Sequence, residues 1–315
     1  MVNKMNKSEK IFVIGHKNPD TDSICSALAY AFFKKAKGKN VIAARAGEIC
    51  DETRFVLDYF KVKEPVLIKD AIGKKLILVD HTNPSQAVDN VEEADIIEII
   101  DHHRLGGLET KSPLFARIEP VGSTATIVAD MFFSDNIKMD KTIAGLLLSA
   151  LLSDTIIFRA VTTTEKDKKI AKELAKISGL DPEKFGMEIK KAGSSIKTKT
   201  EREIIESDFK LFDSMKLGVG QIQIVDNAEI NERKEKILKE MEKMRLEKNC
   251  KTLMLMVTNI LAQDTDLWIV GETAVAEKAF KEKVKNNSIY LKGVMSRKKQ
   301  IIPPLREVLL KEGAL

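Results

Sequence analysis

The sequence contains little cysteine, few aromatic residues and no long apolar run. Its three cysteines, Cys25, Cys50 and Cys250, are odd in number and widely spaced, which favours free thiols in a reducing compartment over a disulfide framework. Aromatic residues make up 5% of the chain, too few to suggest a stacking surface for single-stranded nucleic acid. The most apolar run, residues 143–152, is too short to cross a bilayer. We therefore expect no membrane partner.

The charge is balanced as well. The 315 residues include 52 Lys and Arg against 47 Asp and Glu, which gives a net charge of +5. A nucleic-acid-binding protein usually carries a clustered cationic face, so we expect no nucleic-acid partner. The polar residues 1–7 contain no apolar signal-peptide core, and together with the free thiols they predict a cytoplasmic protein.

Short apolar segments alternate with helical patterns in the first part of the chain. This alternation predicts an α/β fold with a doubly wound parallel sheet. Strands are expected at residues 10–15, 40–46, 75–80 and 94–100. Helices are expected around residues 27–33, 51–60, 122–134, 141–152, 165–178 and 182–192.

Small and polar residues at 193–198 separate two helical patterns and predict a linker. We accordingly expect an N-terminal domain over residues 1–192 and a smaller C-terminal α+β domain over residues 199–315. The elements expected in the second domain are helices at 199–206, 229–248 and from 274, and strands at 208–212, 218–225, 252–258 and 266–271.

Three of the four histidines lie in short segments rich in carboxylates. The polar residues that follow expected strands are His16, Asp20, Asp22, Asp80, His102 and His103. Because the carboxyl ends of parallel strands meet at one edge of a sheet, we expect these side chains to converge. Asp154 ends a nearly apolar helical pattern, where a carboxylate needs a cap or a cation to offset its desolvation. Imidazole with carboxylate suits Mn²⁺, Fe²⁺ or Zn²⁺.

Each segment taken alone also has a plain structural explanation. Residues 18–23 could form a turn in which Asp22 or Ser23 caps the following helix, and Asp80 could be a helix cap or a surface strand end. We interpret His81 as a structural neighbour of the site rather than a ligand. Residues 296–300 alone would be a solvated basic patch, although a carboxylate-rich site that binds a polyanion needs such cations opposite its metals.

Several segments resemble, in order, the motifs of family II inorganic pyrophosphatases in the DHH phosphoesterase superfamily. They are GHKNPDTDS (15–23), VDH (79–81), DHHR (101–104), EPVGSTAT (119–126) and LSDT (152–155). SRKKQ (296–300) resembles the signature of that family's C-terminal, DHHA2-type domain. The chain departs from the usual pattern at residues 82–84, 105–107 and 159–161 without replacing a proposed ligand, which leaves the tuning of the site open.

The resemblance implies which residues form the site. A first metal would lie on His16, Asp20 and Asp80. A second metal would lie on Asp22, Asp80, His102 and Asp154, with Asp80 bridging. The residues implied to bind pyrophosphate and to act in catalysis are His103, Lys210, Arg297 and Lys298. The resemblance further implies two Mn²⁺ per subunit, replaceable by Co²⁺, with Mg²⁺ entering with the substrate.

The implied reaction is manganese-dependent hydrolysis of inorganic pyrophosphate to two phosphates, by a metal-bridged hydroxide that attacks in line. The resemblance places the active site in the cleft between the domains and implies a homodimer formed through the N-terminal domain. One alternative is a related hydrolase that cuts oligonucleotides, cyclic dinucleotides or short polyphosphate. The nuclease-type members carry a C-terminal motif rich in glycine and histidine, whereas this chain has no histidine after His103. Another alternative is a catalytically idle regulator that binds metal and phosphate, against which the complete ligand set argues.

Overall fold

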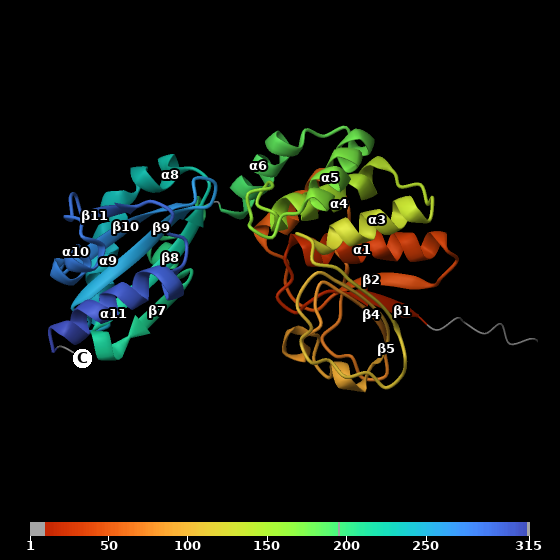
Figure 1. Cartoon of the computed structure of the whole chain (residues 1–315), viewed down its shortest axis with the longest axis horizontal. Coiled ribbons are helices and arrows are strands. Elements are labelled where there is room, and N and C mark those ends of the chain that lie inside the picture. The colour runs from red at the N-terminus through yellow and green to blue at the C-terminus, as the bar shows by residue number, and fades with distance from the viewer. Residues whose placement is uncertain (1–9, 195, 314–315) are drawn as a thin grey trace, which may run out of the picture. The chain divides into compact units, whose positions relative to one another are not determined.

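The computed structural model describes residues 10–194 and 196–313. The polar start at residues 1–7 and Ser195 of the expected linker lie outside the described residues. The chain forms two compact units, Met1–Gly193 and Ser194–Leu315, shown in Figure 1. No helix in the described part of the chain is long and apolar enough to cross a membrane.

The first unit is built on a parallel sheet with the strand order β3-β2-β1-β4-β5-β6. The strands are β1 Ile11–Ile14, β2 Val41–Arg45, β3 Val66–Leu67, β4 Lys75–Val79, β5 Asp95–Asp101 and β6 Phe115–Ile118. The order reverses between β1 and β4, and ligands bind beyond the carboxyl ends of strands at such a point. The predicted α/β fold with a parallel sheet is confirmed. The short strands β3 and β6, which carry exposed side chains, were not predicted.

Helices cover one face of this sheet (Figure 1). They are α1 Thr21–Ala36, α2 Asp51–Phe60, α3 Thr124–Ser134, α4 Lys141–Asp154, α5 Glu165–Ser178 and α6 Pro182–Gly193. Helix α1 contacts β1 and β2, α3 contacts β5, and α4 packs on both helices. The opposite face is covered by apolar residues of segment 68–94, which contains the short 3-10 helices η1 Pro84–Gln86 and η2 Val91–Glu93.

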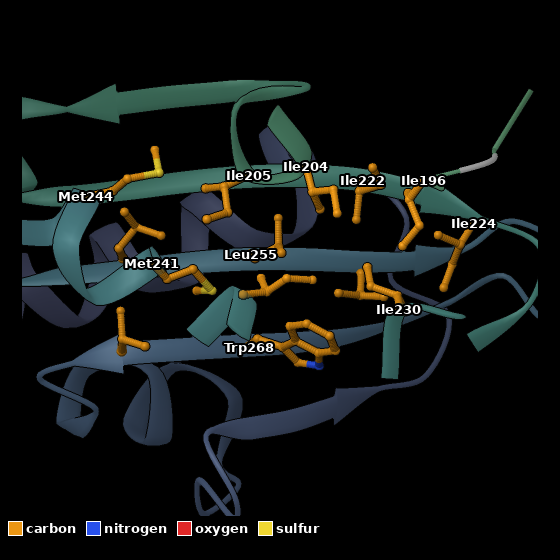
Figure 2. Packing of buried hydrophobic residues seen from close by; sticks show 14 residues of the cluster. Ile196, Ile204, Ile205, Ile222, Ile224, Ile230, Met241, Met244, Leu255 and Trp268 are labelled. Carbon is orange, nitrogen blue, oxygen red and sulfur yellow. The ribbon is translucent and has the colours of Figure 1, made fainter. Parts of the chain in front are cut away.

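The second unit contains a smaller mixed sheet with the order β11-β10-β9-β8-β7, in which only β8 and β9 are parallel. The strands are β7 Phe209–Phe212, β8 Leu217–Ile224, β9 Thr252–Asn259, β10 Asp264–Gly271 and β11 Ser288–Leu291. One face packs against α7 Glu201–Glu206, α8 Asn227–Glu232 and α9 Lys234–Glu247. Figure 2 shows this core, where Trp268 and Leu255 of the sheet lie beside Met241 of α9.

The other face of that sheet packs against α10 Ala274–Phe280 and α11 Ile302–Lys311. The single helix predicted over residues 229–248 is wrong, because the chain breaks at Arg233 between α8 and α9. The guanidinium of Arg233 donates hydrogen bonds to the carbonyl oxygens of Ile196 and Lys199 and to Glu201. The break therefore lies where the side chain anchors the start of the second unit.

Candidate metal centre and phosphate pocket

The loop after β1 returns the chain sharply into α1. Asp20 caps this helix, since its Oδ1 accepts a hydrogen bond of 2.9 Å from the backbone N–H of Ser23. The alternative in which Asp22 or Ser23 caps the helix is therefore wrong. Gly15 permits the return, because a Cβ at that position would lie 1.8 Å from the Oγ of Ser23.

Asp22 is fully buried against the N-terminus of α3. Its Oδ2 accepts a 2.7 Å hydrogen bond from the N–H of Thr124, and its Oδ1 accepts bonds from the N–H of Ala125 and the hydroxyl of Ser26. Burial raises the pKa of Asp22 well above its usual value, and repulsion by Asp80 adds to the increase. The positive end of the α3 dipole works in the opposite direction and favours the carboxylate.

Asp80 lies at the end of β4 between two histidines. Its Oδ2 is 3.4 Å from the Nε2 of His16, and its Oδ1 is 3.5 Å from the Nε2 of His102. Thr124 donates a hydrogen bond of 2.9 Å to Oδ1. Burial works to raise the pKa of Asp80, but the nearby imidazoles of His102 and His16 outweigh burial and lower the pKa. The backbone of Asp80 is left-handed, with φ of 66°, a strained conformation that is often found at functional sites.

His102 is oriented by a backbone carbonyl. Its Nδ1 lies 2.9 Å from the carbonyl oxygen of Val121, so its Nε2 faces Asp80, Asp154 at 3.3 Å and Asp22 at 4.0 Å. Ligating histidines commonly donate their other N–H to a carbonyl in this way. Asp154 is the last residue of α4, where the negative end of the helix dipole favours a cation.

The six predicted metal ligands fall into two groups that share Asp80. The groups are His16, Asp20 and Asp80, and Asp22, Asp80, His102 and Asp154. Within each group the candidate ligand atoms lie within 4.8 Å of one another. Oδ2 of Asp80 and Nε2 of His102 are buried without a hydrogen-bond partner among the described residues. Burying such atoms unpaired is costly, so the donor set fits divalent cations that prefer nitrogen and oxygen ligands.

His103 and His81 flank these groups. His103 is about half exposed, and its Nδ1 lies 2.9 Å from Oδ1 of the buried Asp101, which raises the pKa of His103. Asp80, His102 and His103 form a third possible cluster. His81 is buried, and its Nδ1 lies 2.9 Å from the carbonyl oxygen of Val79. His81 belongs to none of the candidate groups among the described residues, so its interpretation as a neighbour stays a prediction.

Lys210, Arg297 and Lys298 line one pocket of the second unit. Its volume is about 500 Å³, and its other lining residues are Asp208, Phe212, Gln221, Gln223, Met295, Ser296 and Ile302. The two lysines are exposed, whereas Arg297 is only 8% exposed. The guanidinium of Arg297 donates to Asp208 through the side chain and the carbonyl oxygen of that residue. The pocket therefore presents two exposed ammonium groups beside one buried guanidinium that Asp208 holds in place.

Known proteins share this architecture along nearly the whole chain. Residues 10–151 match the DHH family, N-terminal domain, and residues 187–308 match the DHHA2 domain. The chain is 49% identical to the manganese-dependent inorganic pyrophosphatase of Methanothrix thermoacetophila, over 96% of this chain and 100% of the relative. The chain belongs to the family II inorganic pyrophosphatases.

Other relatives of this family II chain agree with the assignment. The manganese-dependent inorganic pyrophosphatase of Bacillus subtilis is 43% identical, over 96% of this chain and 99% of the relative. The crystal structure of a Methanococcus jannaschii putative family II inorganic pyrophosphatase superimposes with a TM-score of 0.64 at 44% identity, over 95% of this chain and 99% of the other. The predicted family and its DHH and DHHA2 domains are confirmed.

Sequence reasoning missed two supporting residues of this family II site. Thr124 donates to Asp80, and Asp101 accepts from the N–H groups of His102 and His103 as well as holding the His103 ring. Both residues lie inside motifs noted in the sequence, so the motifs carried a signal. The role of Thr124 depends on where α3 begins beside the sheet, which no local pattern reveals, whereas Asp101 acts on the two residues that follow it.

Proposed function

We propose that this chain hydrolyses inorganic pyrophosphate to two phosphates, with Mn²⁺ as the activating ion. The observation that carries the proposal is the pair of imidazole and carboxylate groups that share the buried Asp80. The relatives described above bear the name manganese-dependent inorganic pyrophosphatase and match this chain almost end to end, which supports the same substrate.

The residues divide between two cations. His16, Asp20 and Asp80 would hold one Mn²⁺. Asp22, Asp80, His102 and Asp154 would hold the other, so Asp80 would bridge the two. Bound there, the cations would supply an activated water near neutral pH and would neutralise phosphate charge. We extend the proposal to Co²⁺ as a substitute and to Mg²⁺ that arrives with the substrate.

The protein's own residues prepare this site. The N-terminus of α3 fixes Asp22, Thr124 holds Asp80, and the carbonyl oxygen of Val121 keeps Nε2 of His102 directed at the carboxylates. Such preorganisation means that the ligands need little rearrangement when charge develops.

The remaining site residues act on the substrate. Asp101 raises the pKa of His103, so the imidazole keeps its proton to a higher pH and can donate it towards the leaving phosphate. Lys210, Arg297 and Lys298 would bind phosphate oxygens, and the fixed guanidinium of Arg297 would set the position of one of them.

We also propose a catalytic domain over residues 1–192, a linker over 193–198 and a substrate-binding domain over 199–315. A homodimer through the first domain is supported by β6, an edge strand on which Phe115 is half exposed, because an unpaired edge is a template for pairing. A cytoplasmic location is supported by the three free cysteines.

One assay separates the proposal from its alternatives. Phosphate release should be measured with Mn²⁺ from pyrophosphate, from tripolyphosphate and, after phosphatase treatment, from a dinucleotide. We expect pyrophosphate to be hydrolysed much faster than the other two. Faster hydrolysis of tripolyphosphate would indicate an exopolyphosphatase, and no hydrolysis of any substrate would indicate a metal-binding regulator.

A further inference from the structure

A cluster of polar side chains, defined by Thr21, Glu52, Ser153 and Lys190, joins four helices of the first unit. Glu52 of α2 accepts hydrogen bonds from the hydroxyls of Thr21, at 2.9 Å, and Ser153. The ammonium of Lys190 in α6 lies 3.0 Å from Oε2 of Glu52 and 3.1 Å from Oγ of Ser153. The side chains of Glu52 and Lys190 are only 14% and 12% exposed, so this ion pair is largely shielded from water.

The cluster lies directly beside predicted metal ligands in the sequence. Thr21 stands between Asp20 and Asp22, and Ser153 precedes Asp154. Thr21 and Ser153 belong to the first turn of α1 and the last turn of α4. A helical turn is stiff, so a displacement of either residue also displaces the carboxylate next to it.

The end of α6 touches the same glutamate at a second point. Gly193 is the last residue of α6, one turn after Lys190. A Cβ on Gly193 would lie 2.9 Å from both Cβ and Oε2 of Glu52. Helix α6 therefore contacts Glu52 through Lys190 and through a position that has no room for a side chain, immediately before the division between the two units.

We propose that Glu52 and Lys190 are positioning residues for the second cation, whose ligands include Asp22 and Asp154. By holding Thr21 and Ser153 together, the ion pair keeps the first turn of α1 and the last turn of α4 at the spacing that the cation requires. The last turn of α6 thereby influences the affinity of the metal centre. The inference rests on the proposed function for the identity of the cation, Mn²⁺.

Charge makes the pair effective in this role. Hydrogen bonds between ionised groups are shorter and stronger than neutral ones, and removing one member leaves the other charged and poorly solvated. Residues that orient metal ligands without touching the metal commonly change metal affinity by about 10–100-fold when they are substituted. A purely structural ion pair would change the melting temperature and leave metal affinity unaltered.

The test compares two lysine variants of the full chain. Lys190→Met should weaken binding of one Mn²⁺ by about 10-fold or more in calorimetric titration, and should change the electron paramagnetic resonance spectrum of bound Mn²⁺. Lys184→Met is the matched control, because Lys184 is exposed on the same helix. The control should bind like the unaltered chain, and Lys190→Arg, which retains the charge, should recover most of the affinity.

Two further variants test the cluster from the other side. Glu52→Gln should weaken binding of the same Mn²⁺. The double variant Glu52→Gln with Lys190→Met should lose less affinity than the two single losses combined, because each residue acts through the other. Gly193→Ala should also weaken binding of this Mn²⁺, because the added Cβ would press on Glu52. This loss is expected even though alanine stabilises a helix more than glycine does. If circular dichroism shows that a charge variant is unfolded, Gly193→Ala and Ser153→Ala decide the question.

The two proposals can fail separately, because Mn²⁺ binding is measured without pyrophosphate. If folded Lys190→Met and Glu52→Gln bind both cations with unaltered affinity and spectrum, the positioning role is wrong, even if both melt earlier. If the unaltered chain binds two Mn²⁺ but does not hydrolyse pyrophosphate, the proposed function fails. A loss of Mn²⁺ affinity in the variants would support the positioning role in either case.

Discussion

The buried carboxylate of Asp22 accepts a 2.7 Å hydrogen bond from the backbone N–H of Thr124, 102 residues further along the chain. This bond ties the first turn of α1 to the first turn of α3. Because Thr124 also donates to Asp80 through its hydroxyl, one residue orients two of the predicted metal ligands. These two carboxylates are therefore oriented by hydrogen bonds from the protein itself.

Asp80 should be the least replaceable residue. Asparagine keeps its shape and one good acceptor oxygen but removes the charge that offsets repulsion between two nearby dications. We expect Asp80→Asn to lose one Mn²⁺ and to reduce turnover by several orders of magnitude while the fold stays intact. Metal content and pyrophosphate turnover of the purified variant check this. Binding of both cations with unaltered affinity would show that Asp80 does not bridge them.

Asp22→Asn is the informative comparison. It should affect metal binding less, since Asp22 lies in only one of the two groups. Asp22→Asn should destabilise the fold more than Asp80→Asn does, because the NH₂ group of the new asparagine would face the N–H of Thr124 or Ala125. We expect a loss of roughly 1–3 kcal/mol in the metal-free protein, seen as a lower melting temperature. A melting temperature equal to that of Asp80→Asn would count against this difference.

The cationic side chains of the pocket in the second unit should also differ in their roles. Lys298→Ala should raise the KM for pyrophosphate without changing stability, because Lys298 is exposed. Arg297→Ala should raise KM and also destabilise the second unit by about 1–3 kcal/mol, since carbonyl oxygens of Asp208 and Val219 lose a donor. Lys299→Ala, which removes an exposed neighbouring charge, serves as the control. Loss of bound Mn²⁺ with unchanged KM would contradict these roles.

Metal binding should release protons. Burial works to lower the pKa of His16, but the carboxylates of Asp20 and Asp80, at 3.5 and 3.4 Å from its Nε2, outweigh burial and raise the pKa to about 10. Burial also works to lower the pKa of His102, but the carboxylates of Asp154 and Asp80 outweigh burial and raise this pKa to about 12. Both rings are therefore protonated at neutral pH without metal, and a ligating Nε2 must be neutral. We expect about two protons released per subunit and Mn²⁺ affinity that rises from pH 6 to 9.

Calorimetry in buffers with different ionisation enthalpies counts these protons. Mn²⁺ affinity that does not change with pH, together with no buffer dependence of the enthalpy, would contradict binding through these two imidazoles.

Much of the site could be predicted because the topology of a parallel sheet determines which residues lie together. His16, Asp80 and His102 each follow a buried parallel strand, and parallel strands end at one edge. The sequence could not show which residue caps α1, because Asp20 and Asp22 are both suitable acceptors. Only the path of the loop selects Asp20. The attachment of Arg297 to Asp208 joins residues 89 apart, so no local pattern indicates it.

The proposed homodimer has its own test. Light scattering of the Mn²⁺-loaded protein should give about twice the 35.2 kDa of one chain. Phe115→Glu on the exposed edge strand β6 should shift the mass towards the monomer, because it places a charge in the expected contact. A monomer in the unaltered protein at saturating Mn²⁺ would count against assembly through the first domain.

The most direct test of the central claim is pyrophosphate hydrolysis by one preparation before and after its metal is removed. The protein should be treated with a chelator and dialysed, and phosphate release should be measured with excess chelator, with Zn²⁺ or Ca²⁺, and with Mn²⁺. We predict no activity in chelator and the greatest recovery with Mn²⁺, because the shared carboxylate and imidazole groups suit that ion. Full activity in excess chelator would contradict the account.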